Sequence, residues 1–115
     1  MPKLSIRIDL DGGGRLGPGK VMLLERIAEH GSISAAARSL GMSYRRAWDL
    51  VAALNGGFRA ALVAAEAGGQ RGGGAQLTPL GRALVAHYRA IEREAAAAAE
   101  PYLRALLDAQ GPAAS

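Results

Sequence analysis

The chain has 115 residues, of which 50% are hydrophobic and 21% charged, and its formal net charge is +4 at pH 7. This length allows one domain with a single core and leaves no room for a separate catalytic domain, and no apolar stretch reaches the roughly 20 residues of a membrane-spanning helix. The absence of cysteine excludes disulfides and thiolate metal sites, while the positive charge is as compatible with an arginine-rich composition as with a polyanionic partner.

The first ten residues alternate apolar and polar side chains, which predicts a half-buried N-terminal strand. This pattern differs from the apolar run of a secretory signal, so we expect a cytoplasmic protein. Residues 11–19 are glycine-rich and are expected to form a loop. A helix should begin at Pro18 and end at Gly31. Its buried face is predicted to carry Val21, Leu24, Ile27 and Ala28.

Two short helices are expected over about residues 32–55, joined by a turn at Gly41. Ser32 or Ser34 can cap the first helix, and Ser43 can cap the second, which should run to about Leu54. The inner face of the second helix would comprise Ala47, Leu50, Val51 and Leu54. Two short helices around a glycine-containing turn predict a helix-turn-helix.

Two extended segments over about residues 61–77 predict a two-stranded wing. Thr78 and Pro79 should start a long helix over about residues 78–109, which Pro101 is expected to end or kink. We therefore predict one α+β domain over residues 1–115. Its fold would be a winged helix-turn-helix with an N-terminal strand, a wing and a long C-terminal dimerisation helix.

The second helix of the predicted helix-turn-helix would meet base edges in the major groove with its first turns. Arg45 could contact a guanine or a phosphate, and Arg46 lies closer to the inner face. Asp49 could accept from a cytosine amino group or pair with Arg46 three residues earlier, and Trp48 should lie at the edge of the core. The predicted DNA-binding residues are Ser34, Ser43, Tyr44, Arg45, Arg46, Trp48, Asp49, Gln70 and Arg71.

These segments resemble the LysR-type regulators and, more closely, the DNA-binding half of the molybdate-responsive regulators of the ModE family. The resemblance spans about residues 4–107 and rests on Gly31-Ser-Ile-Ser, Ser43-Tyr44, Ala47-Trp48-Asp49, the loop over residues 68–75, and Leu77-Thr78. It implies a recognition-helix face at Tyr44, Arg45, Trp48 and Asp49, and a wing tip at Gln70 and Arg71. The family usually has a basic residue where Gln70 stands here.

The resemblance implies a bacterial transcription regulator that binds duplex DNA sequence-specifically and is linked to genes of molybdenum transport or metabolism. The family's oxyanion-binding domains have no counterpart in these 115 residues, so we expect no small-molecule effector on this chain alone. We expect a homodimer through Leu84, Tyr88, Ile91, Ala95, Leu103 and Leu107 of the long helix. The alternative is a dimeric winged-helix module that binds another protein, such as a separate sensor subunit. Finding Arg45, Arg46 and Arg71 scattered instead of on one face would favour it.

A third hypothesis concerns nucleotide binding. Residues 14–20 match the spacing of a phosphate-binding loop, but Val21 replaces the hydroxyl that such a loop needs for Mg²⁺. Catalysis has little support, because His30 and His87 lack partners at metal-ligand spacing. Glu92 and Glu94 are expected on an exposed helix surface. We therefore expect no enzyme, no cofactor and no metal.

Overall fold

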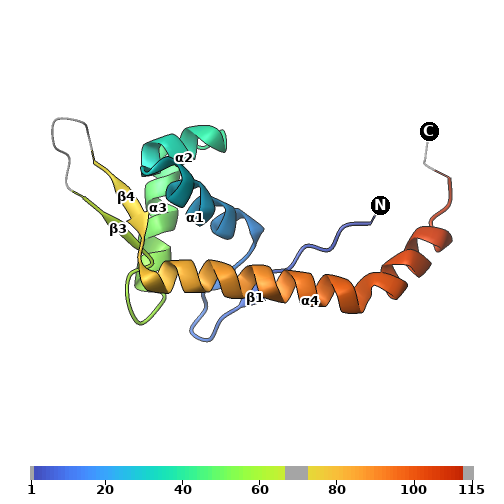
Figure 1. Cartoon of the computed structure of the whole chain (residues 1–115). Coiled ribbons are helices and arrows are strands. Elements are labelled where there is room, and N and C mark those ends of the chain that lie inside the picture. Colours follow the sequence, from blue (N-terminus) through green and yellow to red (C-terminus); the bar gives the residue numbers. More distant parts are fainter. Residues whose placement is uncertain (1, 67–72, 113–115) are drawn as a thin grey trace.

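A computed structural model describes residues 2–66 and 73–112. The elements follow in the order β1 (Ile8–Asp9), β2 (Arg15–Leu16), α1 (Pro18–His30), α2 (Ile33–Ser39), α3 (Tyr44–Gly56), β3 (Val63–Ala65), β4 (Ala75–Leu77) and α4 (Pro79–Ala109). Helices α1, α2 and α3 gather beside the β3–β4 hairpin, and α4 runs out from this body as a long arm (Figure 1). The arrangement confirms the predicted α+β winged helix-turn-helix.

Helix α1 lies at the centre of the core and contacts α2, β4 and α4. Its residues Val21, Leu24 and Ile27 are completely buried, as predicted. The prediction was wrong for Ala28, which is exposed, and it missed Leu23, which is completely buried. Because three elements pack on α1, the buried part of its surface is wider than a single amphipathic stripe. It extends to the side that carries Leu23 and leaves out Ala28.

The N-terminal segment departs from the prediction in two ways. The paired strand is only two residues long, and its partner β2 lies inside the segment that we expected to be a loop. Gly12 and Gly13 make the return between the strands with φ angles of 86° and 97°, a conformation that suits glycine. A glycine-rich tight turn and an open loop have the same composition, so the sequence did not reveal this hairpin.

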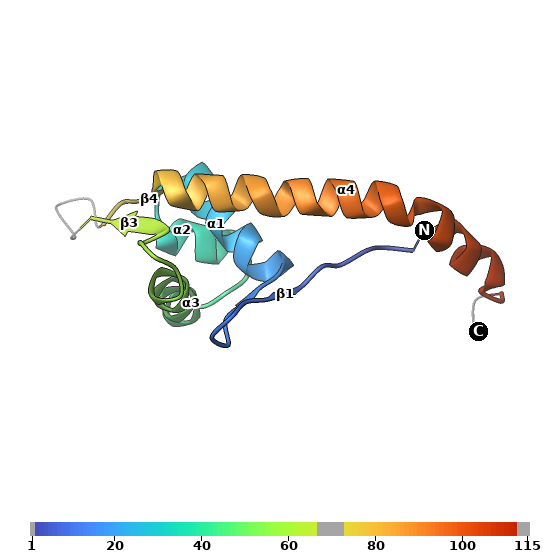
Figure 2. The same ribbon diagram turned by 90° about the horizontal axis from the view of Figure 1, so that it is seen from below.

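The residues before β1 continue along α4, as Figure 2 shows. The Tyr88 hydroxyl donates a hydrogen bond to the Ile6 carbonyl oxygen at 2.6 Å, and the Tyr88 side chain is only 1% exposed. Burial raises the pKa of this hydroxyl. Tyr88 is therefore used within the chain, and its expected place in a dimer interface was wrong.

Arg89 joins α4 to α1. Its Nε and Nη2 donate to the two carboxylate oxygens of Glu25 at 3.0 and 2.5 Å, and its Nη1 donates to Glu92 at 2.5 Å. These hydrogen bonds hold the pKa of the Glu25 carboxyl below its usual 4.5, although burial acts in the opposite direction. They also raise the pKa of Arg89. Glu92, expected on an exposed surface, is thus part of the ion pair that fixes the direction of α4.

Helix α4 begins as predicted, since the Thr78 hydroxyl accepts from the Gly81 N–H at 3.0 Å and Pro79 occupies the first turn. It does not end at Pro101 but continues to Ala109, and it bends toward its C-terminal part (Figures 1 and 2). A proline removes one helical hydrogen bond and can be accommodated by such a bend. In the two described ranges, no helix is both long and apolar enough to span a membrane.

Candidate nucleic-acid interface

The turn between α2 and α3 is built from short local signals. Ser32, not Ser34, caps α2, and its hydroxyl accepts from the Ala35 N–H at 3.0 Å. Gly41 takes the left-handed conformation in the turn, with φ 64°. Ser43 caps α3, because its hydroxyl accepts from the Arg46 N–H at 3.1 Å. These bonds set the point at which α3 begins and therefore which side chains occupy its first turn.

The inner face of α3 packs on the core. Ala47, Val51 and Leu54 are buried as predicted, and Leu50 is half-buried. The helix continues to Gly56, two residues past the expected end at Leu54. Apolar side chains of α2, α3 and the turn between them are buried or partly buried; they are Ile33, Leu40, Met42 and Leu54. With this side covered, the first turns of α3 present their opposite side to solvent.

Tyr44 and Trp48 form an aromatic pair on the outer side of α3. Their side chains are four residues apart, with ring centroids 6.3 Å apart in an edge-to-face arrangement at 78°. The Trp48 indole N–H donates to the Tyr44 hydroxyl. Tyr44 is 54% exposed and Trp48 39% exposed, so Trp48 lies at the edge of the core, as expected. Each ring fixes the other, and both remain accessible.

Two arginines and one aspartate surround this pair. Arg45 Nε lies 3.9 Å from the Asp49 carboxylate, while Arg46 is exposed and not turned toward the core. The predicted pair between Arg46 and Asp49 was wrong, because Arg45 is the closer partner at four residues' distance. Both members of the observed pair are highly exposed, so the interaction is weak and Arg45 is free to turn to another anion.

The wing is attached to the helical body at two places, the end of α1 and the last turn of α3. Strand β4 is held to the end of α1 by the Ala75 N–H, which donates to the Gly31 carbonyl oxygen at 2.9 Å. The predicted wing-tip residues Gln70 and Arg71 lie outside the described residues. Ser34 is exposed on α2 and Ser43 is engaged in its cap. The structure thus brings the predicted residues of α3 together at one end of that helix.

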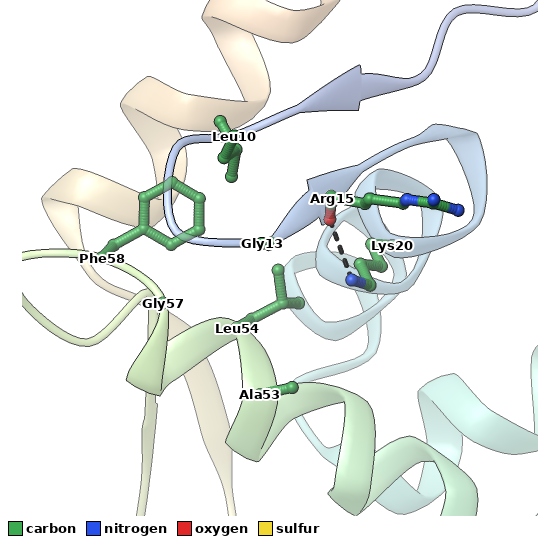
Figure 3. A pocket seen from close by; sticks show the side chains of 9 residues that line it. Leu10, Gly13, Arg15, Lys20, Ala53, Leu54, Gly57 and Phe58 are labelled. Atoms are coloured by element: carbon green, nitrogen blue, oxygen red, sulfur yellow. Dashed lines mark hydrogen bonds between the residues drawn. The ribbon is translucent and has the colours of Figure 1, made fainter.

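The glycine-rich segment that suggested a phosphate-binding loop lies elsewhere. It contains β2 and the start of α1, beside a hollow of about 300 Å³. Figure 3 shows the Lys20 ammonium directed at the Arg15 carbonyl oxygen, to which it donates at 2.8 Å. The Arg15 guanidinium pairs instead with Asp9 at 3.1 Å. Both cations are engaged within the chain, so this segment carries no argument for a nucleotide.

The described residues also contain no group of three or more histidine, aspartate or glutamate side chains that could hold a metal ion. The exposed face of α3 and the adjoining wing therefore remain the strongest candidate site.

A comparison with protein families matches residues 19–82, more than half of the chain, to the family described as bacterial regulatory helix-turn-helix protein, lysR family. The chain belongs to this lysR family. The match runs from α1 to the first turn of α4 and so contains the helix-turn-helix and the wing. It confirms the predicted lysR-type helix-turn-helix.

Two of the relatives compared with this lysR-family chain carry molybdenum in their names, and a third is named as a transcriptional regulator. It is 54% identical over 80 residues to the molybdenum-pterin-binding protein MopB of Rhodobacter capsulatus, and the aligned segment covers 70% of this chain and 30% of that protein. It is 45% identical over 87 residues to the molybdenum transport protein ModE of Azotobacter vinelandii, and this segment covers 76% of this chain and 32% of the relative. Over 71 residues it is 42% identical to the transcriptional dual regulator ModE of Escherichia coli, covering 62% and 27%.

These names confirm the resemblance to the ModE family. The chain spans about a third of the length of the curated relatives that it matches.

Proposed function

We propose that this chain is a bacterial transcription regulator that binds duplex DNA sequence-specifically as a homodimer. The observation that carries the proposal is the exposed face at the start of α3, where Tyr44, Arg45, Trp48 and Asp49 gather on the first turns of the helix. In a winged helix-turn-helix this end of the recognition helix enters the major groove. The wing would then lie at adjacent phosphates.

Each side chain of this face suits one kind of contact. Arg45 can pair with the O6 and N7 acceptors of guanine or with a phosphate, and Asp49 can accept from a cytosine amino group. The aromatic pair of Tyr44 and Trp48 offers an apolar edge that suits a thymine methyl group. The N-terminal end of α3 adds a partial positive charge that favours phosphate.

Two copies would pair through the distal part of α4. Ile91 is 43% exposed, and Tyr102 and Leu106 are 72% and 64% exposed, an unusual series of large apolar side chains on one helix. Ala95, Leu103 and Leu107, which the sequence placed in the interface, are half-buried on the same arm. Leu84 packs against the core and would lie at the inner edge of the interface.

The names of the relatives support a regulator of genes for molybdenum transport or use, working in the bacterial cytoplasm where its DNA lies. We propose no catalytic role and no cofactor for it. The competing hypothesis, a module that binds a separate sensor protein, predicted scattered arginines. Arg45 and Arg46 are both exposed at the start of α3, which supports DNA binding, while Arg71, the third arginine of that criterion, lies outside the described residues.

The test is selection of binding sites from random duplex DNA with the purified chain, followed by salt titration on the recovered site. We expect one enriched sequence and an affinity that falls with salt, with a log–log slope of about −0.9 for each phosphate neutralised. Arg45→Ala should cost about 1–3 kcal/mol on this site if Arg45 contacts a base. Arg93→Ala, which removes the same charge from α4, is the control. Undetectable binding at low ionic strength would contradict the proposal.

A further inference from the structure

Asn55 lies in the last turn of α3, and its side chain reaches the beginning of the wing. Its Oδ1 accepts from the Leu62 N–H at 2.9 Å and from the Val63 N–H at 3.1 Å. Its Nδ2 donates to the Val63 carbonyl oxygen at 3.1 Å. One half-buried amide group thus makes three hydrogen bonds to backbone that lies seven and eight residues further along the chain.

The two bonds to Val63 lie on the open edge of β3. Glu66 N–H donates to the Gly74 carbonyl oxygen and Thr78 N–H donates to the Leu62 carbonyl oxygen, so within β3 it is Ala64, midway between them, whose backbone groups point toward β4. The N–H and C=O of Val63 point the other way, to the open edge where a further strand would lie. The Asn55 amide presents one donor and one acceptor there, as the peptide group of a neighbouring strand would.

A separate contact holds the other strand of the wing. Ala75 N–H donates to the Gly31 carbonyl oxygen at 2.9 Å, which attaches β4 to the end of α1. In the part of the chain that the structure describes, every hydrogen bond that joins α3 directly to the wing comes from Asn55. A change at Asn55 would therefore leave the wing attached to the domain but release it from the recognition helix.

We propose that Asn55 is a positioning residue for DNA binding, which fixes the wing relative to α3. Base contacts from α3 and phosphate contacts from the wing would then fall on one duplex in one fixed register. This inference rests on the proposed function. Asn55 lies at the opposite end of α3 from the face of Tyr44 and Arg45, so it would act through the wing and not by touching bases.

The test uses the DNA site recovered by selection, in a long duplex and in a duplex trimmed to the segment that α3 covers. For the wild-type chain, the salt dependence on the long duplex should be steeper by about 0.9 in log–log slope for each phosphate that the wing contacts. Asn55→Ala should abolish most of this difference and keep its affinity for the short duplex. Asn55→Asp keeps both bonds accepted by Oδ1 and should keep most of the difference.

Ser39→Ala is the control, because it removes one side-chain hydrogen bond, to the Ala36 carbonyl oxygen, without touching α3 or the wing. All variants are compared at a temperature where circular dichroism shows them folded. A difference between the duplexes that survives in Asn55→Ala, or that Ser39→Ala also abolishes, would overturn the positioning role, as would a wild type that shows no difference. Absence of wild-type binding to both duplexes would instead contradict the proposed function.

Discussion

At Gly81, α4 passes close to the base of the wing. A Cβ atom there would lie 2.2 Å from the Leu62 carbonyl oxygen and 3.0 Å from its carbonyl carbon. These are backbone atoms of a completely buried residue, so they cannot move aside as a flexible side chain would. Glycine is therefore required by space and not by its φ angle.

Gly81→Ala should lower the free energy of unfolding by about 1–2 kcal/mol, because an overpacking cost at the upper end of about 1–3 kcal/mol outweighs the gain of up to about 1 kcal/mol that alanine brings to a helix. Gly19→Ala is the matched control, since it lies in α1 with no atom within 4 Å of its added Cβ. It should be neutral or stabilising. Urea unfolding measures both variants. Equal effects of the two substitutions would show that the junction at Leu62 yields easily.

Asp49 is the acidic residue of the proposed DNA-binding face. Its pair with Arg45 is exposed, so Asp49→Asn should change stability by no more than about 0.5 kcal/mol. A carboxylate about 4 Å from a phosphate costs about 1 kcal/mol in water, so the substitution should raise affinity for unrelated DNA by up to about fivefold. Competition with unrelated duplex measures this loss of discrimination. Unchanged affinity for unrelated DNA would place Asp49 away from the phosphates.

At the scale of elements, the contact between α1 and α4 depends on ionised Glu25. The folded-state pKa of Glu25 is lowered, so its contribution is present above the unfolded pKa of 4.5 and is lost as the pH falls through the folded value. Glu25→Gln should reduce stability at pH 7 by about 0.5–1 kcal/mol, the upper range for partly exposed pairs, because the bond to Arg89 is bidentate.

The stability gap between the wild type and Glu25→Gln should narrow below about pH 4.5. Glu29→Gln removes the same charge from an exposed position of the same helix and should show little effect at either pH. Thermal melting across this pH range provides the measurement. A gap that stays constant as the pH falls would mean that charge at Glu25 is not what holds α4.

Elements with their own local signals were predictable from the sequence. Gly41 indicates the turn after α2 and Ser43 indicates the start of α3. Thr78 and Pro79 indicate the start of α4 in the same way. The two-residue strand β2 was not predictable, because so short a strand exists only through its pairing with β1. Helix α4 continues past Pro101 because a bend in the helix accommodates the proline.

The candidate site was also predictable only where local signals define it. Tyr44, Arg45 and Trp48 follow from their distance from the cap at Ser43, so their shared face could be derived from helical spacing. Asn55 was not predicted as a site residue. Its role depends on where the chain returns after eight residues, and the only local signal was an asparagine placed before two glycines and an apolar strand.

The whole molecule is elongated, with extents of 57 × 34 × 23 Å. The 31 residues of α4 account for this shape, because at 1.5 Å per residue they span about 46 Å. The helix-turn-helix and the wing cover only the first part of it (Figure 1). A helix of that length cannot be packed by so small a domain, and its distal apolar side chains remain exposed in a single chain.

Dimerisation through this distal part is tested by placing an arginine on either of two opposite faces of α4 and comparing the two variants. Leu106 is 64% exposed, so Leu106→Arg should leave the single chain folded but place a charge in the proposed interface. Burying a leucine contributes about 1.5–3 kcal/mol, so the dimer dissociation constant should rise more than tenfold. Ala97→Arg is the control, because nine residues at about 100° each place it on the opposite face. Light scattering should show a dimer for the wild type and for Ala97→Arg, and a monomer for Leu106→Arg at the same concentration.

DNA binding provides a second measurement of the same interface. In Leu106→Arg, affinity for a palindromic site, whose half-sites lie about 34 Å apart, should fall because the dimer is lost, while affinity for a single half-site should not change. A wild-type monomer at tens of micromolar would exclude this interface.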